Sequence, residues 1–278
     1  PVARALPGRV LLPVLGDHYG TVLENGELKL VFDAEQGSFS VFYHEHRFPV
    51  DPREYPRILN HRLERLQARI GAHPKFLELQ SLIAAFGHLP LRDGASQEAV
   101  AERVRDKEVH KHRLASLLAG SAHIAQFIQE NVTAFNGAVP DAASFDPLHE
   151  LLEAQAYRLA FWRVAADEIN YRRFFDLNDM AALRMDNLEV FESTHRLTRE
   201  LLARGYVSGL RLDHPDCLYA PQEYLERLQA IAAALSPETP GDYSNPPYLV
   251  GANIPSPHDS LPAFSPGPWM TCAPLVGS

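Results

Sequence analysis

The second half of the sequence alternates helical and strand patterns with short connections, which leaves few folds open to the chain. Apolar residues spaced by three and four predict helices that begin at Asp146, Asn187 and Pro221. Short apolar runs at 207–213 and 248–250 predict strands on either side of the last helix. Alternation of this kind is typical of a parallel sheet or a (β/α) barrel.

The helix predicted at Asp146 has Pro147 in its first turn, where a missing N–H is harmless. Its apolar pattern continues through Tyr157 and Trp162, and a loop at 170–176 is expected after it. A tryptophan at helical spacing belongs to a core more often than it stacks on a sugar. We therefore expect Trp162 to be buried.

Short alternating apolar runs near the N-terminus predict a three-stranded meander. The runs are Thr21–Leu23, Leu28–Phe32 and Phe39–Tyr43. Asn25-Gly26 and Gln36-Gly37 separate them, and Asn-Gly between alternating runs is the strongest short hairpin signal.

The expected fold class is α/β, namely an incomplete (β/α) barrel portion with a large, mainly helical insertion and a small N-terminal β-meander. Helical spacing with charged outer faces extends from Tyr55 to Val139. Ten of the 22 prolines follow Ser236, which predicts an irregular tail. The predicted segments are the meander at 1–54, the helical insertion at 55–145, the partial barrel at 146–254 and the tail at 255–278.

Charge and cysteine content narrow the partners and the compartment. With 26 basic against 35 acidic residues the net charge is −9, which argues against nucleic acid or an anionic membrane as a partner. Two cysteines make no disulfide framework, and neither a membrane-length apolar run nor a signal peptide is visible. We expect a cytoplasmic protein, and a start at Pro1 without Met fits a fragment or a processed product.

Arg211 and Asp213 are the strongest candidates for chemistry. If the strand ends near Asp213, its carboxylate lies at the C-terminal mouth of the sheet, where barrel enzymes carry their reacting groups. Arg211 lies two residues earlier and points to the same side, so its guanidinium would orient the carboxylate and favour its charged form. That form suits a nucleophile, but the spacing alone more often marks a structural ion pair.

Six segments carry a more specific signal. They are Leu11–Gly20, Glu27–Asp33, His46–Pro52, Gln155–Leu159, Ile169–Asp176 and Gly209–Asp216. Together they resemble the alpha-amylase family of glycoside hydrolases, and within it the maltooligosyl trehalose synthase branch. The resemblance extends from about residue 10 to about residue 250 and places the chain in the middle of a longer enzyme.

The resemblance implies intramolecular transglycosylation on a maltooligosaccharide or glucan chain. The reducing-end α-1,4 bond becomes an α,α-1,1 bond, and neither a cofactor nor a metal is implied. In such retaining chemistry one carboxylate attacks the anomeric carbon, while a second carboxyl about 5 to 5.5 Å away donates and then removes a proton.

The matching positions supply the implied site. Asp213 matches the nucleophile and Arg211 its partner. The residues implied to contact the sugar are His214, Asp216, Tyr171, Arg172 and Arg173.

Two positions depart from the family pattern. Cys217 replaces a glycine after His214-Pro-Asp216, which would disturb a turn that needs positive φ. Ala252 stands where the family carries the glutamate that acts as general acid and base. We therefore expect the chain alone to be inactive and to need the remainder of the barrel. A non-catalytic glucan-binding or interaction module, or an α-amylase-type hydrolase, remains an alternative.

Overall fold

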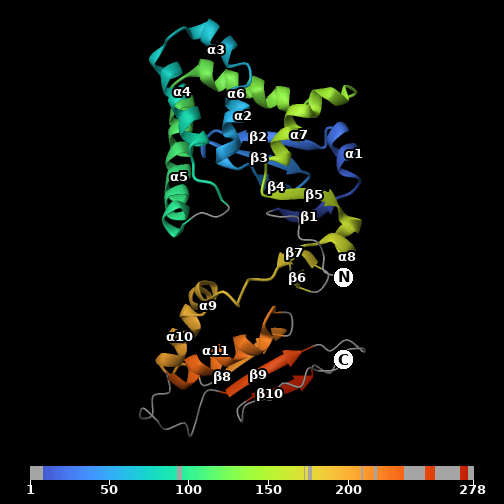
Figure 1. The fold of residues 1–278 in the computed structure, drawn as a ribbon, viewed down its shortest axis with the longest axis vertical. Coiled ribbons are helices and arrows are strands. Elements are labelled where there is room, and N and C mark those ends of the chain that lie inside the picture. Colours follow the sequence, from blue (N-terminus) through green and yellow to red (C-terminus); the bar gives the residue numbers. More distant parts are fainter. Residues whose placement is uncertain are drawn as a thin grey trace. The chain divides into compact units, whose positions relative to one another are not determined.

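A computed structural model describes residues 9–92, 96–171, 173–174, 177–207, 209–215, 218–234, 248–253 and 270–274. The chain divides into two compact units, unit 1 at Pro1–Asn170 and unit 2 at Tyr171–Ser278 (Figure 1). Both units mix helices and strands, which confirms the α/β class. Within the described ranges the strands form separate sheets of two or three strands, and no barrel closes.

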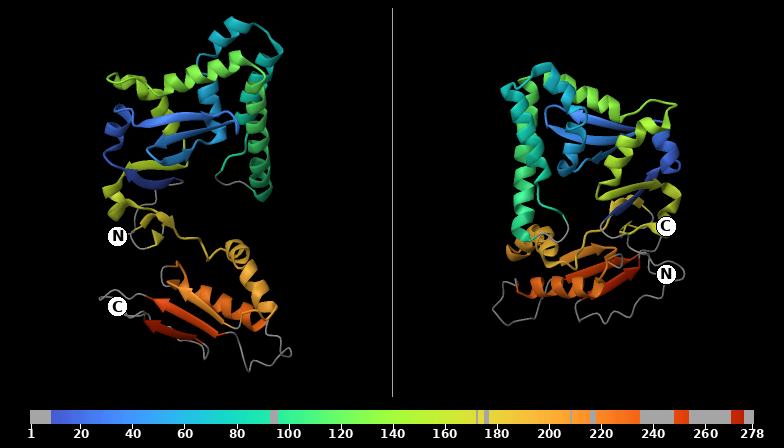
Figure 2. Two further views of the ribbon diagram at one scale, coloured as in Figure 1. Left: turned by 180° about the vertical axis from the view of Figure 1, so that it is seen from behind. Right: turned by 45° about the horizontal axis from the view of Figure 1, so that its top comes forward.

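Unit 1 is a small antiparallel sheet surrounded by helices, with a parallel strand pair beside it. Its strands are β1 (Val10–Leu15), β2 (Leu28–Asp33), β3 (Ser38–Tyr43), β4 (His46–Pro49) and β5 (Tyr157–Phe161). Its helices are α1 (Tyr19–Glu24), α2 (Tyr55–Leu59), α3 (Leu63–Ile70), α4 (Pro74–Gly87), α5 (Gln97–Ala119), α6 (Ala122–Phe135), α7 (Asp146–Glu153) and α8 (Ala165–Glu168). Helices α4 and α5 run side by side (Figure 2).

The predicted meander exists, but it begins one segment later than expected. Its strands are β2, β3 and β4, whereas Thr21–Leu23 lies in helix α1. Asn25-Gly26 ends that helix: Gly26 has a φ of +67°, and its N–H donates to the Leu23 carbonyl at 2.9 Å. The prediction was wrong here because a left-handed glycine suits a helix C-terminus as well as a hairpin. Gln36-Gly37 does form the predicted turn, between β2 and β3.

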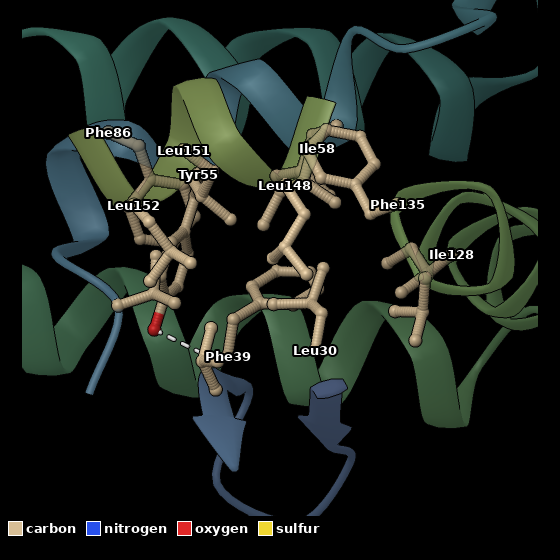
Figure 3. Close-up of a cluster of buried hydrophobic side chains, with 14 of the residues drawn as sticks. Leu30, Phe39, Tyr55, Ile58, Phe86, Ile128, Phe135, Leu148, Leu151 and Leu152 are labelled. Carbon is tan, nitrogen blue, oxygen red and sulfur yellow. Dashed lines mark hydrogen bonds between the residues drawn. The ribbon is translucent and has the colours of Figure 1, made fainter. Parts of the chain in front are cut away.

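The core of unit 1 lies between the meander and the helices that cover it. Side chains of β2, β3, α2, α4, α6 and α7 meet there (Figure 3). The Phe39 N–H donates to the Tyr55 hydroxyl oxygen at 3.1 Å, which satisfies a polar group inside this core. Burial raises the pKa of the Tyr55 hydroxyl above its ordinary value. Helices α2 to α6 all lie in the region from Tyr55 to Val139, which confirms the helical spacing predicted there.

Residues 146–170 belong to unit 1 and not to the segment that we expected to form a barrel. Helix α7 ends at Glu153, and Tyr157 opens strand β5, which pairs in parallel with β1. Trp162 follows that strand in a 3₁₀ turn and is 52% exposed, so the expectation that it is buried was wrong. A parallel pair joins segments that are distant in sequence, so local apolar spacing did not reveal it.

Unit 2 contains the predicted helix at Pro221 and strands at the predicted positions 207–213 and 248–250. The helix predicted at Asn187 is divided in two, and the strands at 173–174, 177–181 and 270–274 were not predicted. In chain order, the described helices and strands of unit 2 are β6 (Arg173–Phe174), β7 (Leu177–Ala181), α9 (Leu188–Thr194), α10 (Arg196–Ala203), β8 (Gly209–Asp213), α11 (Pro221–Ala234), β9 (Tyr248–Asn253) and β10 (Met270–Pro274). Strands β8, β9 and β10 form a parallel sheet. The tail expected to be irregular therefore contains a strand, β10, whose short apolar run becomes a strand only by pairing with β9.

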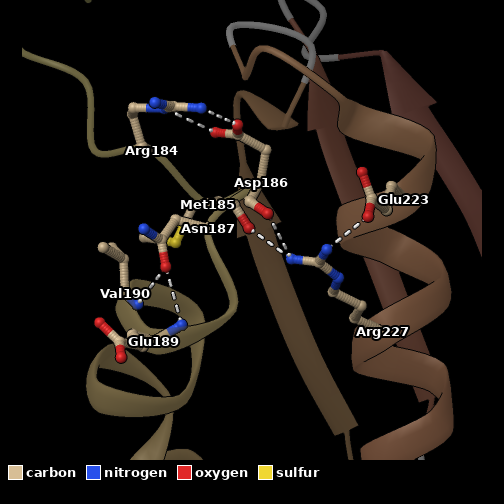
Figure 4. Close-up of polar contacts among 8 residues, drawn as sticks. All are labelled: Arg184, Met185, Asp186, Asn187, Glu189, Val190, Glu223 and Arg227. Atoms are coloured by element: carbon tan, nitrogen blue, oxygen red, sulfur yellow. Dashed lines mark hydrogen bonds and ion pairs between the residues drawn. The ribbon is translucent and has the colours of Figure 1, made fainter.

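Helix α11 is joined to the start of α9 by polar contacts (Figure 4). The Arg227 guanidinium donates to the backbone carbonyls of Met185 at 2.9 Å and Asp186 at 3.1 Å. The Asn187 side chain caps α9, as predicted, by accepting the N–H of Glu189 at 2.9 Å. These contacts hold α9 against α11, and Phe191 and Leu228 belong to the same buried cluster.

The two units are expected to differ in their protection from hydrogen exchange. In unit 1 the buried cluster connects sheet and helices, whereas the described cluster of unit 2 centres on Phe191, Leu202, Leu228 and Ile231. Amides of α4, α6 and β3 should therefore exchange more slowly than those of β8, because opening them exposes more apolar surface. Mass-spectrometric exchange of the intact chain gives both rates in one sample. The greatest protection at 207–213 would contradict this prediction.

The stability of unit 1 is expected to fall as the pH drops below the ordinary pKa of histidine. His110 packs edge-on against Phe86, and its Nδ1 is buried without a hydrogen-bond partner among the described residues. Burial lowers the pKa of His110 below 6.5, helped by Arg113 and opposed by Asp106. A lowered pKa in the folded state gives stability that is complete above the unfolded pKa of about 6.5 and declines as the pH falls.

The test compares melting temperatures at about pH 7.5 and about pH 5.5. Most carboxyl groups stay ionised in this range, so histidines account for most of the proton uptake. His110→Leu should reduce the loss of melting temperature. His112→Leu is the matched control, because His112 is exposed on the same helix. An equal loss in both variants would show that His110 does not cause the pH dependence.

Candidate functional site

The Arg211 and Asp213 side chains meet on one face of β8, as the spacing of two residues predicted. The Arg211 Nε donates to the Asp213 Oδ1 at 3.0 Å. Leu210 and Leu212 point to the opposite face and pack on the buried cluster of unit 2. The apolar residues of this strand therefore fix which way the charged pair faces. In the described structure both charged side chains are open to solvent, at 61% and 60% exposure.

The chain turns sharply where β8 ends. His214 follows Asp213 with a φ of +56°, in the left-handed region that residues other than glycine seldom adopt. Such a conformation costs roughly 1 kcal/mol and concentrates at functional sites. The turn sets Asp213 at the carboxyl end of a parallel strand, which is where α/β sheets bind their ligands.

The register of β9 places Ala252 directly beside Asp213. The two residues are partners across the parallel pair, and Val250 is the partner of Arg211. Register partners share a face of the sheet, and neighbouring strands lie about 4.8 Å apart. A carboxyl group at position 252 would therefore start from a backbone position suited to a pair separated by about 5 to 5.5 Å. Alanine supplies no carboxyl there.

The remaining predicted site residues are less fully described. Tyr171 precedes β6 and Arg173 lies in it, in a ladder separate from the sheet that carries Asp213. Arg172 and Asp216 lie outside the described residues, as does Cys217. Their predicted roles remain predictions.

Asn170, in one of the six motif segments, has a structural role in unit 1. Its Oδ1 accepts the N–H of Leu11 at 2.9 Å, and its Nδ2 donates to the carbonyl of Arg9 at 2.6 Å. These bonds satisfy backbone groups along β1. Part of this motif is thus explained by the fold and not by catalysis.

Two further observations concern metal ligands and membrane-spanning helices. Across the described residues, no group of three or more His, Cys, Asp or Glu side chains is placed to hold a metal ion. No helix in this part of the chain is both long and apolar enough to cross a membrane.

Comparison with known proteins finds relatives over part of the chain. Over 107 residues the chain is 34% identical to proteins described as putative maltooligosyl trehalose synthase in two strains of Mycobacterium tuberculosis. This chain is related to maltooligosyl trehalose synthase over part of its length. The match includes 33% of the chain and 14% of those relatives, so the chain spans a small share of their length. No protein-family model matches the chain.

Solved structures of the same kind of enzyme also match. The DSM5389 glycosyltrehalose synthase is 21% identical with a TM-score of 0.41, over 91% of this chain and 22% of the other. The maltooligosyltrehalose synthase of Arthrobacter ramosus is 23% identical with a TM-score of 0.42, over 92% of this chain and 19% of the other.

Four side chains in unit 1 form a further group, of which only Trp162 was weighed from the sequence as a sugar contact, and a place in the core was favoured for it. His18, Phe161, Trp162 and Arg163 gather at the carboxyl ends of β1 and β5. In the sequence, Phe161-Trp162-Arg163 directly follows an apolar run, but the apolar spacing there indicated a helix and not a strand end.

Proposed function

We propose that this chain supplies the nucleophile strand of an enzyme that rearranges the reducing end of a maltooligosaccharide. In the reaction an α-1,4 bond becomes an α,α-1,1 bond within one molecule, with retention at the anomeric carbon. The observation that carries the proposal is Asp213 at the end of β8, held by Arg211 at 3.0 Å, in a chain related to the trehalose-forming synthases.

In the proposed reaction the Asp213 carboxylate attacks the anomeric carbon and displaces the sugar oxygen, forming a glycosyl-enzyme. Arg211 is a positioning residue that aims this carboxylate. The freed glucose turns over and attacks the same carbon through its anomeric hydroxyl. His214, Asp216, Tyr171, Arg172 and Arg173 would contact the sugar and exclude water from the intermediate.

The reaction also needs a proton for the departing sugar oxygen, and position 252 is where the family has its glutamate. Because Ala252 supplies no proton donor, we propose that the chain alone turns over natural substrate very slowly. Because residues 146–170 pack in unit 1, the partial barrel is proposed for residues 171–254 and the helical insertion for residues 55–145.

The test is a product assay on maltopentaose with the Ala252→Glu variant, supplied with the segments that the relatives carry on either side. The proposed rearrangement lowers the reducing-end signal while the mass of the sugar stays constant. A rising reducing-end signal would instead identify a hydrolase and overturn the proposal.

One alternative has an observation in its favour. Because Ala252 removes the proton donor, the chain fits a glucan-binding module that has lost catalysis on the same scaffold. Saturable binding of maltopentaose without turnover, also after Ala252→Glu, would establish this alternative.

A further inference from the structure

The parallel pair in unit 1 ends in a group of aromatic side chains. Leu15 ends β1 and is the register partner of Phe161, which ends β5, so both carboxyl ends lie at one edge. The chain continues from these ends into His18 and into Trp162-Arg163. The carboxyl ends of parallel strands are the common ligand-binding edge of an α/β sheet.

The aromatic rings at this edge lie close to one another. The ring centroids of His18 and Phe161 are 5.2 Å apart, and those of Phe161 and Trp162 are 6.0 Å apart. The Arg163 guanidinium carbon lies 5.7 Å from the Phe161 centroid and 5.4 Å from the Trp162 centroid. A cation at this distance from two ring faces is held by attraction to both. These four residues form the strand-end platform.

Trp162 is unusually exposed for a tryptophan side chain. It is 52% exposed, although a side chain of this size is usually mostly buried. A large apolar ring left open beside polar groups is typical of a binding surface. Asp17 lies next to the platform, and its Oδ1 accepts the His18 N–H at 2.6 Å. The platform and Asp17 therefore bring together one carboxylate and one guanidinium.

We propose that the strand-end platform binds a glucose unit of an α-glucan, as an accessory site within unit 1. The C–H face of a pyranose ring is apolar and stacks on an indole, while its hydroxyls at the rim bond to groups such as Asp17 and Arg163. One carboxylate and one guanidinium together favour a neutral polyol over a phosphate or a nucleotide. The choice of an α-glucan as ligand rests on the proposed function.

The experiment is a fluorescence titration with maltoheptaose. The chain has two tryptophans, and Trp269→Phe leaves Trp162 as the only reporter. We expect a saturable change in emission and reduced quenching by acrylamide when maltoheptaose is bound. Emission and quenching that do not change with maltoheptaose would overturn the proposal.

Substitutions then test the contact by calorimetry in the otherwise unchanged chain. Trp162→Ala should weaken maltoheptaose binding by about tenfold, and Trp162→Phe by less, because it keeps an aromatic ring. Tyr206→Ala is the matched control, since Tyr206 is an aromatic residue of unit 2 that is 70% exposed. Unchanged affinity in Trp162→Ala would overturn the proposal. If that variant does not fold by circular dichroism, the acrylamide result decides.

The outcome is separable from that of the proposed function. Asp213→Asn should leave the emission change of Trp162 intact, since the platform needs no nucleophile. Turnover is measured in the Ala252→Glu background with the flanking segments supplied. There, loss of turnover in Asp213→Asn with an intact Trp162 response in the chain supports both proposals, and normal turnover with that response overturns only the role of Asp213.

Discussion

Replacing Ala252 by glutamate is expected to raise turnover of maltooligosaccharides by about 10²- to 10⁴-fold, the usual worth of a positioned proton donor. The assay supplies the flanking segments that the relatives carry. The physical reason is the register of β9, in which residue 252 is the partner of Asp213. A glutamate at this position shares the face of the nucleophile and can protonate the departing sugar oxygen.

The control for this prediction is a substrate that needs no proton. Fluoride leaves without protonation, so the parent chain and Ala252→Glu should release fluoride from α-glucosyl fluoride at similar rates in the first turnover, before the base-assisted second step limits the parent. Val250→Glu is the matched variant, because position 250 lies on the same face of β9 but is the partner of Arg211. It should give no gain on maltooligosaccharides. Equal rates for parent and Ala252→Glu on the natural substrate would mean that the proton donor lies elsewhere.

Replacing Asp213 by asparagine is expected to lower turnover by several orders of magnitude on both substrates. An amide of the same size cannot form the glycosyl-enzyme, and this step precedes either product. The effect on α-glucosyl fluoride distinguishes a lost nucleophile from a lost proton donor. The measurement is initial rates in the Ala252→Glu background with both substrates.

Folding should survive this substitution. The Arg211–Asp213 pair is more than half exposed, and exposed ion pairs contribute about 0 to 1 kcal/mol to stability. Asp186→Asn is the matched control, because Arg184 and Asp186 repeat the same spacing in unit 2 and pair at 2.5 Å. Hydrogen bonding to Arg184 lowers the pKa of Asp186, so this carboxylate is charged at neutral pH. Near-normal turnover in Asp213→Asn, or an equal loss in Asp186→Asn, would refute the assignment.

The features that could be predicted from the sequence depend on neighbours along the chain. Asn187 caps α9 through the N–H group two residues later, and Pro221 opens α11. The pairing of Arg211 with Asp213 follows from strand geometry, which returns a side chain to the same face every second residue. Apolar spacing was long and regular enough from Tyr55 to Val139 to identify the helices there.

The tertiary structure decided what depends on partners far along the chain. Thr21–Leu23 alternates too briefly to separate helix from strand, and packing of α1 settled it. Because β5 pairs with β1, residues 146–170 belong to unit 1, and Trp162 lies exposed at a strand end. Only the register of β8 with β9 set Ala252 beside Asp213. The register between two distant strands leaves no signal in either sequence. Sliding one strand by two residues keeps the same side chains on the same face, so the alternation of side chains alone does not select the register.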